Sequence, residues 1–149
     1  MNRPQLTIAA TKNQGPFNLG FHRAKRDAER YAWHKAGLPW PARALLMEII
    51  KRSNQAWRGV WASQSQLAKG ADISKASVKR HMRHLERAGL VRRIGLLHTH
   101  QTRRPIVVYE CGLLTGHYNE AAIQETIAPS ATGRFQPGAF PTEQQALFG

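Results

Sequence analysis

The sequence predicts a mainly α-helical α+β fold, in which short helices are followed by a small β-wing, with flexible N- and C-terminal tails. Apolar residues recur at helical spacing over the first part of the chain, and two short runs rich in β-branched residues come after them. The chain has 149 residues, of which 42% are hydrophobic. That length and composition suit one small domain with tails.

The N-terminal part predicts an arm and one helix. Residues 1–20 contain proline and glycine without apolar periodicity, so we expect a flexible basic arm. Residues 22–36 carry an apolar stripe, and Gly37 and Pro39 end this helix. Its Arg and Lys residues form either a solvated face or a phosphate-binding face, and the pattern favours neither. The helix could equally pair subunits or pack on its own domain.

Three more helices are predicted before the first of the two wing strands. A proline is well placed to start a helix at about 41–53, whose leucines and isoleucines form a buried stripe. Ser63 caps a third helix of about two turns. Ser74 caps a fourth helix, from Lys75 to Ala88, which Gly89 ends.

Three extended segments complete the predicted fold. RGVWAS, residues 58–63, forms a short extended piece between the second and third helices. LVRRI (90–94) and IVVYEC (106–111) read as strands, and residues 96–105 form the loop between them. Helix, short strand, helix, turn, helix, strand, loop, strand is the order of a winged helix-turn-helix.

The predicted domain covers residues 21–112. Apolar periodicity fades after Gly112, and the following residues are rich in Pro, Gly, Ser, Thr and Ala. We therefore expect residues 113–149 to be a mostly disordered tail, with one short helix near 118–126.

Charge indicates the class of partner. The net charge is +13; residues 113–149 contribute one Arg and three Glu, so residues 1–112 carry +15. A folded part this basic attracts polyanions at long range. The distribution favours nucleic acid, with anionic lipid and simple solubility as the alternatives.

The segment QSQLAKGADISKASVKRHMRHLERAGLVRR, residues 64–93, predicts a DNA-reading helix. Val78, Met82 and Leu85 share one face of the fourth helix and turn it toward the core. The opposite face suits the major groove. It carries Lys75, Ser77, Lys79, Arg80, Arg83 and Arg87.

Roles within this face differ. We expect Arg80 to make a bidentate contact to guanine, while Ser77 and Lys79 reach bases or phosphates. Arg83 and Arg87 lie further along the helix and suit the DNA backbone. The two histidines of this helix, His81 and His84, lie between the faces, where a structural role is the better interpretation.

The wing supplies a second group of candidate DNA contacts. Arginines on such a loop suit phosphates or a narrow minor groove, although solvated arginines would give the same pattern. The candidates are Arg92, Arg93, Gln101, Arg103 and Arg104.

Residues 38–112 resemble the winged helix-turn-helix domains of bacterial transcriptional regulators and of plasmid and phage replication proteins. The shared pattern is S-Q-x-x-L-A-x-x-x-x-I-S-x-x-S-V-x-R-x-x-x-x-L-E-x-x-G-L-V. The resemblance is closest to the plasmid and phage replication proteins, in which a Trp- or Pro-containing extended piece and Ser-Gln precede the Leu-Ala pair, as in WRGVWASQSQLA, residues 57–68. The resemblance implies binding to double-stranded DNA. Asp72 departs from the usual glycine at the turn, but Asp tolerates a left-handed backbone. Related domains also bind proteins, usually through an acidic or apolar helix. Residues 74–93 hold seven basic groups and one acidic group, which favours DNA as the partner.

The C-terminus carries a second motif. Gln144, Leu147 and Phe148 lie in a pentapeptide similar to the one with which bacterial proteins bind the replication sliding clamp. The resemblance implies that the glutamine anchors by hydrogen bonds while the Leu and Phe fill an apolar pocket. The alternative is a terminal Leu-Phe pair that folds back onto the domain.

Other classes find little support in the sequence. No apolar run is long enough for a membrane span, and the single cysteine, Cys111, suits a reducing cytoplasm. With DNA binding, we expect a cytoplasmic protein associated with the bacterial nucleoid. His98-Thr99-His100 does not complete a zinc site or a rolling-circle nuclease motif. No glycine-rich phosphate loop is present, so we expect no nucleotide-driven motor. Together with the incomplete metal and nuclease motifs, this leads us to expect no cofactor, no metal and no enzymatic activity.

Three functions remain open: a replication factor of a mobile element, a transcriptional regulator, and a DNA-binding subunit of a larger nucleoprotein complex. All three predict binding to double-stranded DNA, and only the first needs the C-terminal pentapeptide. The sequence identifies neither the DNA site nor an effector. It does not identify the oligomeric state either, because no heptad repeat is long enough to indicate a coiled-coil dimer.

Overall fold

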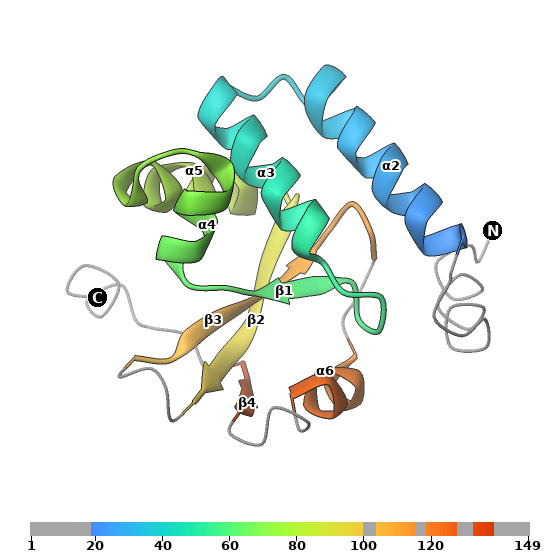
Figure 1. Ribbon diagram of the computed structural model, residues 1–149, viewed down its shortest axis with the longest axis vertical. Coiled ribbons are helices and arrows are strands. Elements are labelled where there is room, and N and C mark those ends of the chain that lie inside the picture. The colour runs from blue at the N-terminus through green and yellow to red at the C-terminus, as the bar shows by residue number, and fades with distance from the viewer. Residues whose placement is uncertain (1–18, 100–103, 116–118, 128–132, 139–149) are drawn as a thin grey trace.

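The computed structural model describes residues 19–99, 104–115, 119–127 and 133–138 (Figure 1). The predicted α+β fold is confirmed, with a bundle of helices packed on a small antiparallel sheet. The elements are α2 (Leu19–His34), α3 (Trp40–Arg52), β1 (Gly59–Trp61), α4 (Gln64–Ala71), α5 (Lys75–Arg87), β2 (Val91–His98), β3 (Ile106–Cys111), α6 (Glu120–Ile127) and β4 (Arg134–Pro137).

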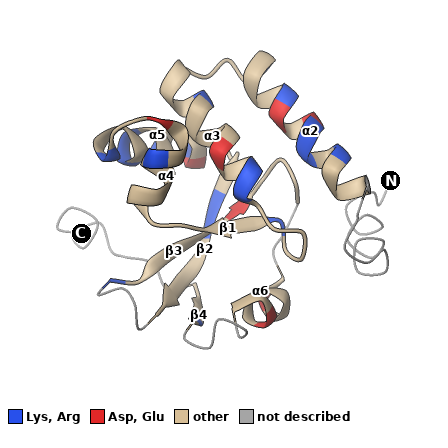
Figure 2. Cartoon of the chain, in the orientation of Figure 1, with Lys and Arg blue, Asp and Glu red and all other residues tan. Residues whose placement is uncertain are grey.

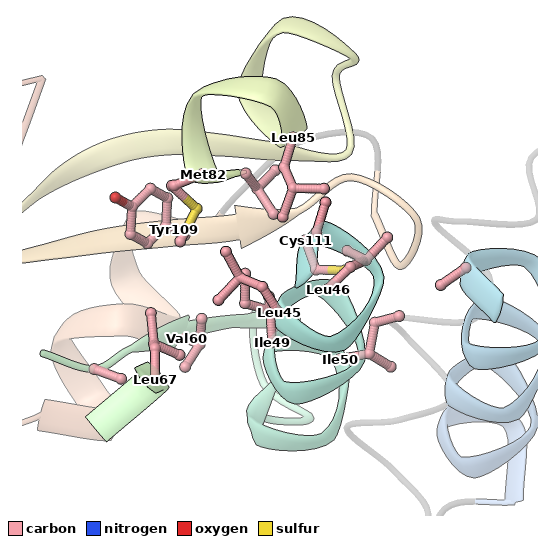
Figure 3. Packing of buried hydrophobic residues seen from close by; sticks show 14 of the residues in the cluster. Leu45, Leu46, Ile49, Ile50, Val60, Leu67, Met82, Leu85, Tyr109 and Cys111 are labelled. Carbon is pink, nitrogen blue, oxygen red and sulfur yellow. The ribbon is translucent and has the colours of Figure 1, made fainter. Parts of the chain in front are cut away.

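Helix α3 is the centre of the bundle. Its Leu45, Leu46, Ile49 and Ile50 are fully buried, as the predicted stripe requires. Figure 3 shows these side chains between β1 and β3 on one side and α2 on the other. Pro41 lies in the first turn of α3, where its missing N–H is not needed by the helix.

Helix α2 begins three residues earlier than the sequence predicts, at Leu19 rather than residue 22. Phe21 explains the difference, because its buried ring anchors the first turn beneath Arg58. Arg58 is buried too and donates a hydrogen bond to the carbonyl oxygen of Leu114, 3.1 Å away. This long-range contact has no signature in the local sequence. Residues 1–18 of the predicted arm lie outside the described residues.

The turn between α4 and α5 is built as predicted. Ser63 forms a capping box with Gln66, which satisfies two backbone amides at the start of α4. Asp72 ends α4 in the left-handed conformation, with φ 58° and ψ 46°. Ser74 then caps α5 by accepting a hydrogen bond from the backbone amide of Ser77 at 3.1 Å. These caps place the two helices in contact across a tight turn.

The sheet has the order β1-β3-β2-β4, with all neighbours antiparallel. Strand β2 continues to His98, so the prediction of a loop for residues 96–105 was wrong for residues 96–98. Leu96 and Leu97 are buried there because β4 pairs with this part of β2. The pairing joins segments nearly forty residues apart, for example Leu97 with Phe135, and local patterns do not predict it.

A second apolar cluster lies beneath the wing. Ile123 and Ile127 of α6 and Phe135 of β4 are buried there against the sheet. Residues 120–127 and 134–137, which the sequence assigns to a mostly disordered tail, are therefore folded, and the short helix expected near 118–126 is present as α6. Gly95 permits this packing, because a Cβ there would lie 2.4 Å from the Phe135 ring.

Candidate nucleic-acid interface

Helix α5 has one buried face and one basic face. Val78, Met82 and Leu85 are buried against the bundle, as predicted. The side chains that point directly away from this face recur at i, i+4, i+7 and i+11, and all four are exposed. They are Ala76, Arg80, Arg83 and Arg87. We call these four residues the arginine stripe, after its three arginines. Figure 2 shows the Lys and Arg positions of α5 in blue.

Three more predicted contacts lie at the start of α5. Lys75 and Lys79 are exposed beside the stripe. Ser77 is half-buried, and its hydroxyl oxygen accepts a hydrogen bond from Ser74, 3.1 Å away. Ser77 therefore belongs to the cap of the helix as well as to the predicted DNA face.

The two strand arginines are held by carboxylates. Arg92 pairs with the buried Glu110 of β3 at 2.8 Å, and Arg93 pairs with Glu86 of α5 at 2.7 Å. Burial raises the pKa of the Glu86 carboxyl, while Arg93 and then Arg83 act in the opposite direction. The pair of Arg93 and Glu86 attaches the wing to α5 and compensates the only acidic side chain of that helix.

The structure describes only part of the wing tip. Arg104 is exposed just before β3, whereas Gln101 and Arg103 lie outside the described residues. His98 ends β2 with a 2.8 Å hydrogen bond between its Nε2 and the side-chain oxygen of Gln136. This bond ties the base of the tip to β4.

The two histidines of α5 differ. His81 is buried, and its Nδ1 has no hydrogen-bond partner among the described residues. Burial lowers the pKa of His81, and the neighbouring His84 and Arg80 lower it further, so the ring is neutral at physiological pH. The structural role expected for His81 is confirmed. His84 is exposed and meets His81 edge to face, with ring centroids 5.4 Å apart.

Sequence reasoning missed Arg134 as a neighbour of the wing. Arg134 is exposed on β4 and pairs in register with His98. No signal in the local sequence could have found it, since its position depends on the long-range pairing of β4 with β2.

No metal-binding group of three or more His, Cys, Asp or Glu residues occurs within the described ranges. Cys111 is a buried thiol, and burial raises its pKa to about 11. Among the helices that the structure describes, none combines the length and apolar character needed to cross a membrane.

Comparison with known proteins gives one match. No curated protein and no solved structure matches the chain. Residues 36–91 match the model of a family described as a helix-turn-helix domain. The match begins two residues after α2 ends and reaches the first residue of β2, and so includes the capped turn and the arginine stripe. This similarity supports a helix-turn-helix domain, and with it DNA binding, in this part of the chain.

Proposed function

We propose that the protein binds a specific site in double-stranded DNA by inserting α5 into the major groove. The observation that carries this proposal is the arginine stripe on the face of α5 opposite the core. In this interface Arg80 contacts a guanine edge, and Arg83 and Arg87 contact phosphates. Ala76 is small enough to let the start of the helix approach the base edges closely.

The wing and the start of α5 supply the remaining contacts. We assign phosphate or minor-groove contacts to the wing-tip residues, since arginine suits both. Arg92 and Arg93 hold the wing through their carboxylate partners while their exposed faces lie toward solvent. The assigned residues are Lys75, Ser77, Lys79, Arg92, Arg93, Gln101, Arg103 and Arg104.

We further propose that the protein is a replication-associated factor of a plasmid or phage that recruits the sliding clamp. Gln144, Leu147 and Phe148 would bind the clamp; they lie outside the described residues, so this proposal rests on the sequence motif. A protein that binds DNA and clamp together raises the local concentration of the clamp at the DNA site.

Calorimetric titration of the full chain with a bacterial sliding clamp tests this role. We expect binding by the wild type, loss of binding in Leu147→Ala/Phe148→Ala, and unchanged binding in Gln145→Ala, which alters a variable position of the pentapeptide. These side chains would fill the pocket, so removing both should lower the affinity at least a hundredfold. A wild type that does not bind the clamp would contradict the replication role.

The second candidate function is transcriptional regulation, which the helix-turn-helix domain supports equally well. A regulator would repress or activate from its site without residues 141–149, whereas a clamp-recruiting factor would lose function. A DNA-binding subunit of a larger complex would instead show strongly salt-dependent and weakly selective binding. Selection of preferred duplexes from a random pool separates this last case from the other two.

A further inference from the structure

Helix α2 presents a basic face that the α5 interface does not use. Three arginines, Arg23, Arg26 and Arg30, are exposed at spacings of three and four residues and so lie along one side of the helix. The opposite side is buried and consists of Phe21, Ala28 and Ala32. This face lies outside the segment that matches the helix-turn-helix family.

These three arginines form no ion pair with another residue that the structure describes. Asp27 stands at helical spacing from Arg23 and from Arg30, and Glu29 from Arg26. Lys25 differs from the three arginines: its ammonium turns toward α3 and donates a 2.8 Å hydrogen bond to the carbonyl oxygen of Lys51. The outer face thus carries three guanidinium groups, and two carboxylates, those of Asp27 and Glu29, flank it at helical spacing.

The two basic helices lie on opposite sides of α3. Figure 1 shows α3 between α2 and α5, and Figure 2 marks Lys and Arg positions in blue on both outer helices. Each outer helix buries one face toward the bundle and exposes the other. Since packed helices lie about 8–10 Å apart, the two outer faces are on the order of 25 Å apart. A straight duplex held against α5 therefore does not reach Arg23, Arg26 and Arg30.

We propose that the outer face of α2 binds the phosphate backbone of a second duplex segment, so that one protein molecule bridges two stretches of DNA. Charge complementarity selects this occupant, because three guanidinium groups without groove-reading side chains suit phosphates rather than bases. A lipid surface fits less well, because membrane-binding helices bury their apolar face in the bilayer, and here that face packs on α3. Exposed Trp33 does not supply such a face, since its ring lies 5.1 Å beneath the guanidinium of Arg43.

A two-duplex capture assay tests the proposal. One biotinylated duplex carries the preferred site and is held on beads; a second, fluorescent duplex of unrelated sequence is recovered only if the protein bridges them. The test variant is Arg26→Gln/Arg30→Gln. The matched control is Lys35→Gln/Lys51→Gln, which removes the same charge from exposed positions off this face.

We expect the wild type and the control to recover the fluorescent duplex, and the test variant to recover at least fivefold less. Affinity for a single duplex should stay within about twofold for all three proteins. The salt dependence of bridging should weaken in the variant by a log–log slope of about 2, one unit for each lost phosphate contact. Failure of the wild type to bridge, or equal bridging by the test variant, would overturn the proposal.

The proposed bridging rests on the α5 interface as the first DNA contact, and the assay tests the α5 interface separately from the α2 contact. Arg80→Ala should reduce capture of the protein by the bead-bound site. If Arg80→Ala left that capture unchanged, the assignment of α5 would fail, while the role of α2 would still be decided by Arg26→Gln/Arg30→Gln.

Discussion

His81 lies on the buried side of α5, although the residue before it, Arg80, belongs to the arginine stripe. Its ring occupies a core position, and no described residue offers its Nδ1 a hydrogen-bond partner. Burial is the main cause of its lowered pKa. A positive charge on this ring would lie between α5 and the core. Protonation of His81 is therefore linked to folding.

We expect stability to fall as the pH drops through the ordinary histidine pKa of 6.5, because the unfolded chain binds the proton more readily than the folded one. Urea unfolding of the wild type and of His81→Leu at about pH 7.5 and about pH 5.5 measures this effect. The loss of unfolding free energy between the two pH values should be smaller in His81→Leu. His84→Leu removes only a secondary cause of the lowered pKa of His81, so it should keep most of the wild-type loss. An equal loss in all three proteins would contradict the assignment.

At the scale of single residues, the sequence predicts interactions between near neighbours in the chain well. The caps at Ser63 and Ser74 and the left-handed Asp72 follow from neighbours within a few residues, and the structure contains each of them. The carboxylate partners of Arg92 and Arg93 could not be predicted. They come from a neighbouring strand and from α5, and only the tertiary structure brings them within reach.

Among the elements, α6 and β4 distinguish this molecule from a minimal winged helix. They cover the wing with a cluster of their own, separate from the core around α3. The strand at Ile106–Cys111 and the four predicted helices follow from periodicity and caps. The strand at Arg134–Pro137 does not, because a single buried residue, Phe135, gives no alternating pattern to detect.

Phe135→Ala tests whether this cluster holds the wing. The ring is buried over Gly95, so its removal leaves a cavity and should lower the unfolding free energy of the α6–β4 region by about 3 kcal/mol. Hydrogen exchange should accelerate at the amides of residues 95–98 and stay unchanged in α3.

The control for this prediction is Arg134→Ala, which truncates an exposed side chain on the same strand. It should leave hydrogen exchange at residues 95–98 as in the wild type. Unaltered exchange in Phe135→Ala would show that β2 is stable without the cluster, and that α6 and β4 do not support the wing.

The whole molecule places basic surfaces on two sides of one small core. Composition and charge predict a DNA-binding protein, and the matched segment at residues 36–91 agrees. The sequence could not predict that α2 and α5 face apart, because this depends on how both helices pack against α3. Two basic helices that face apart are what the proposed bridging of two duplexes requires, whereas a single DNA interface would need only α5.

The most direct test of the central claim is the affinity of Arg80→Ala for the preferred duplex and for its single-base variants. The loss of a bidentate guanine contact should cost about 1–3 kcal/mol on the preferred site and should relax selectivity at one base pair. Arg30→Ala, an equal truncation on the opposite side of the molecule, should leave both quantities unchanged. Unchanged affinity and selectivity in Arg80→Ala would contradict the insertion of α5 into the major groove with Arg80 as its base-reading residue.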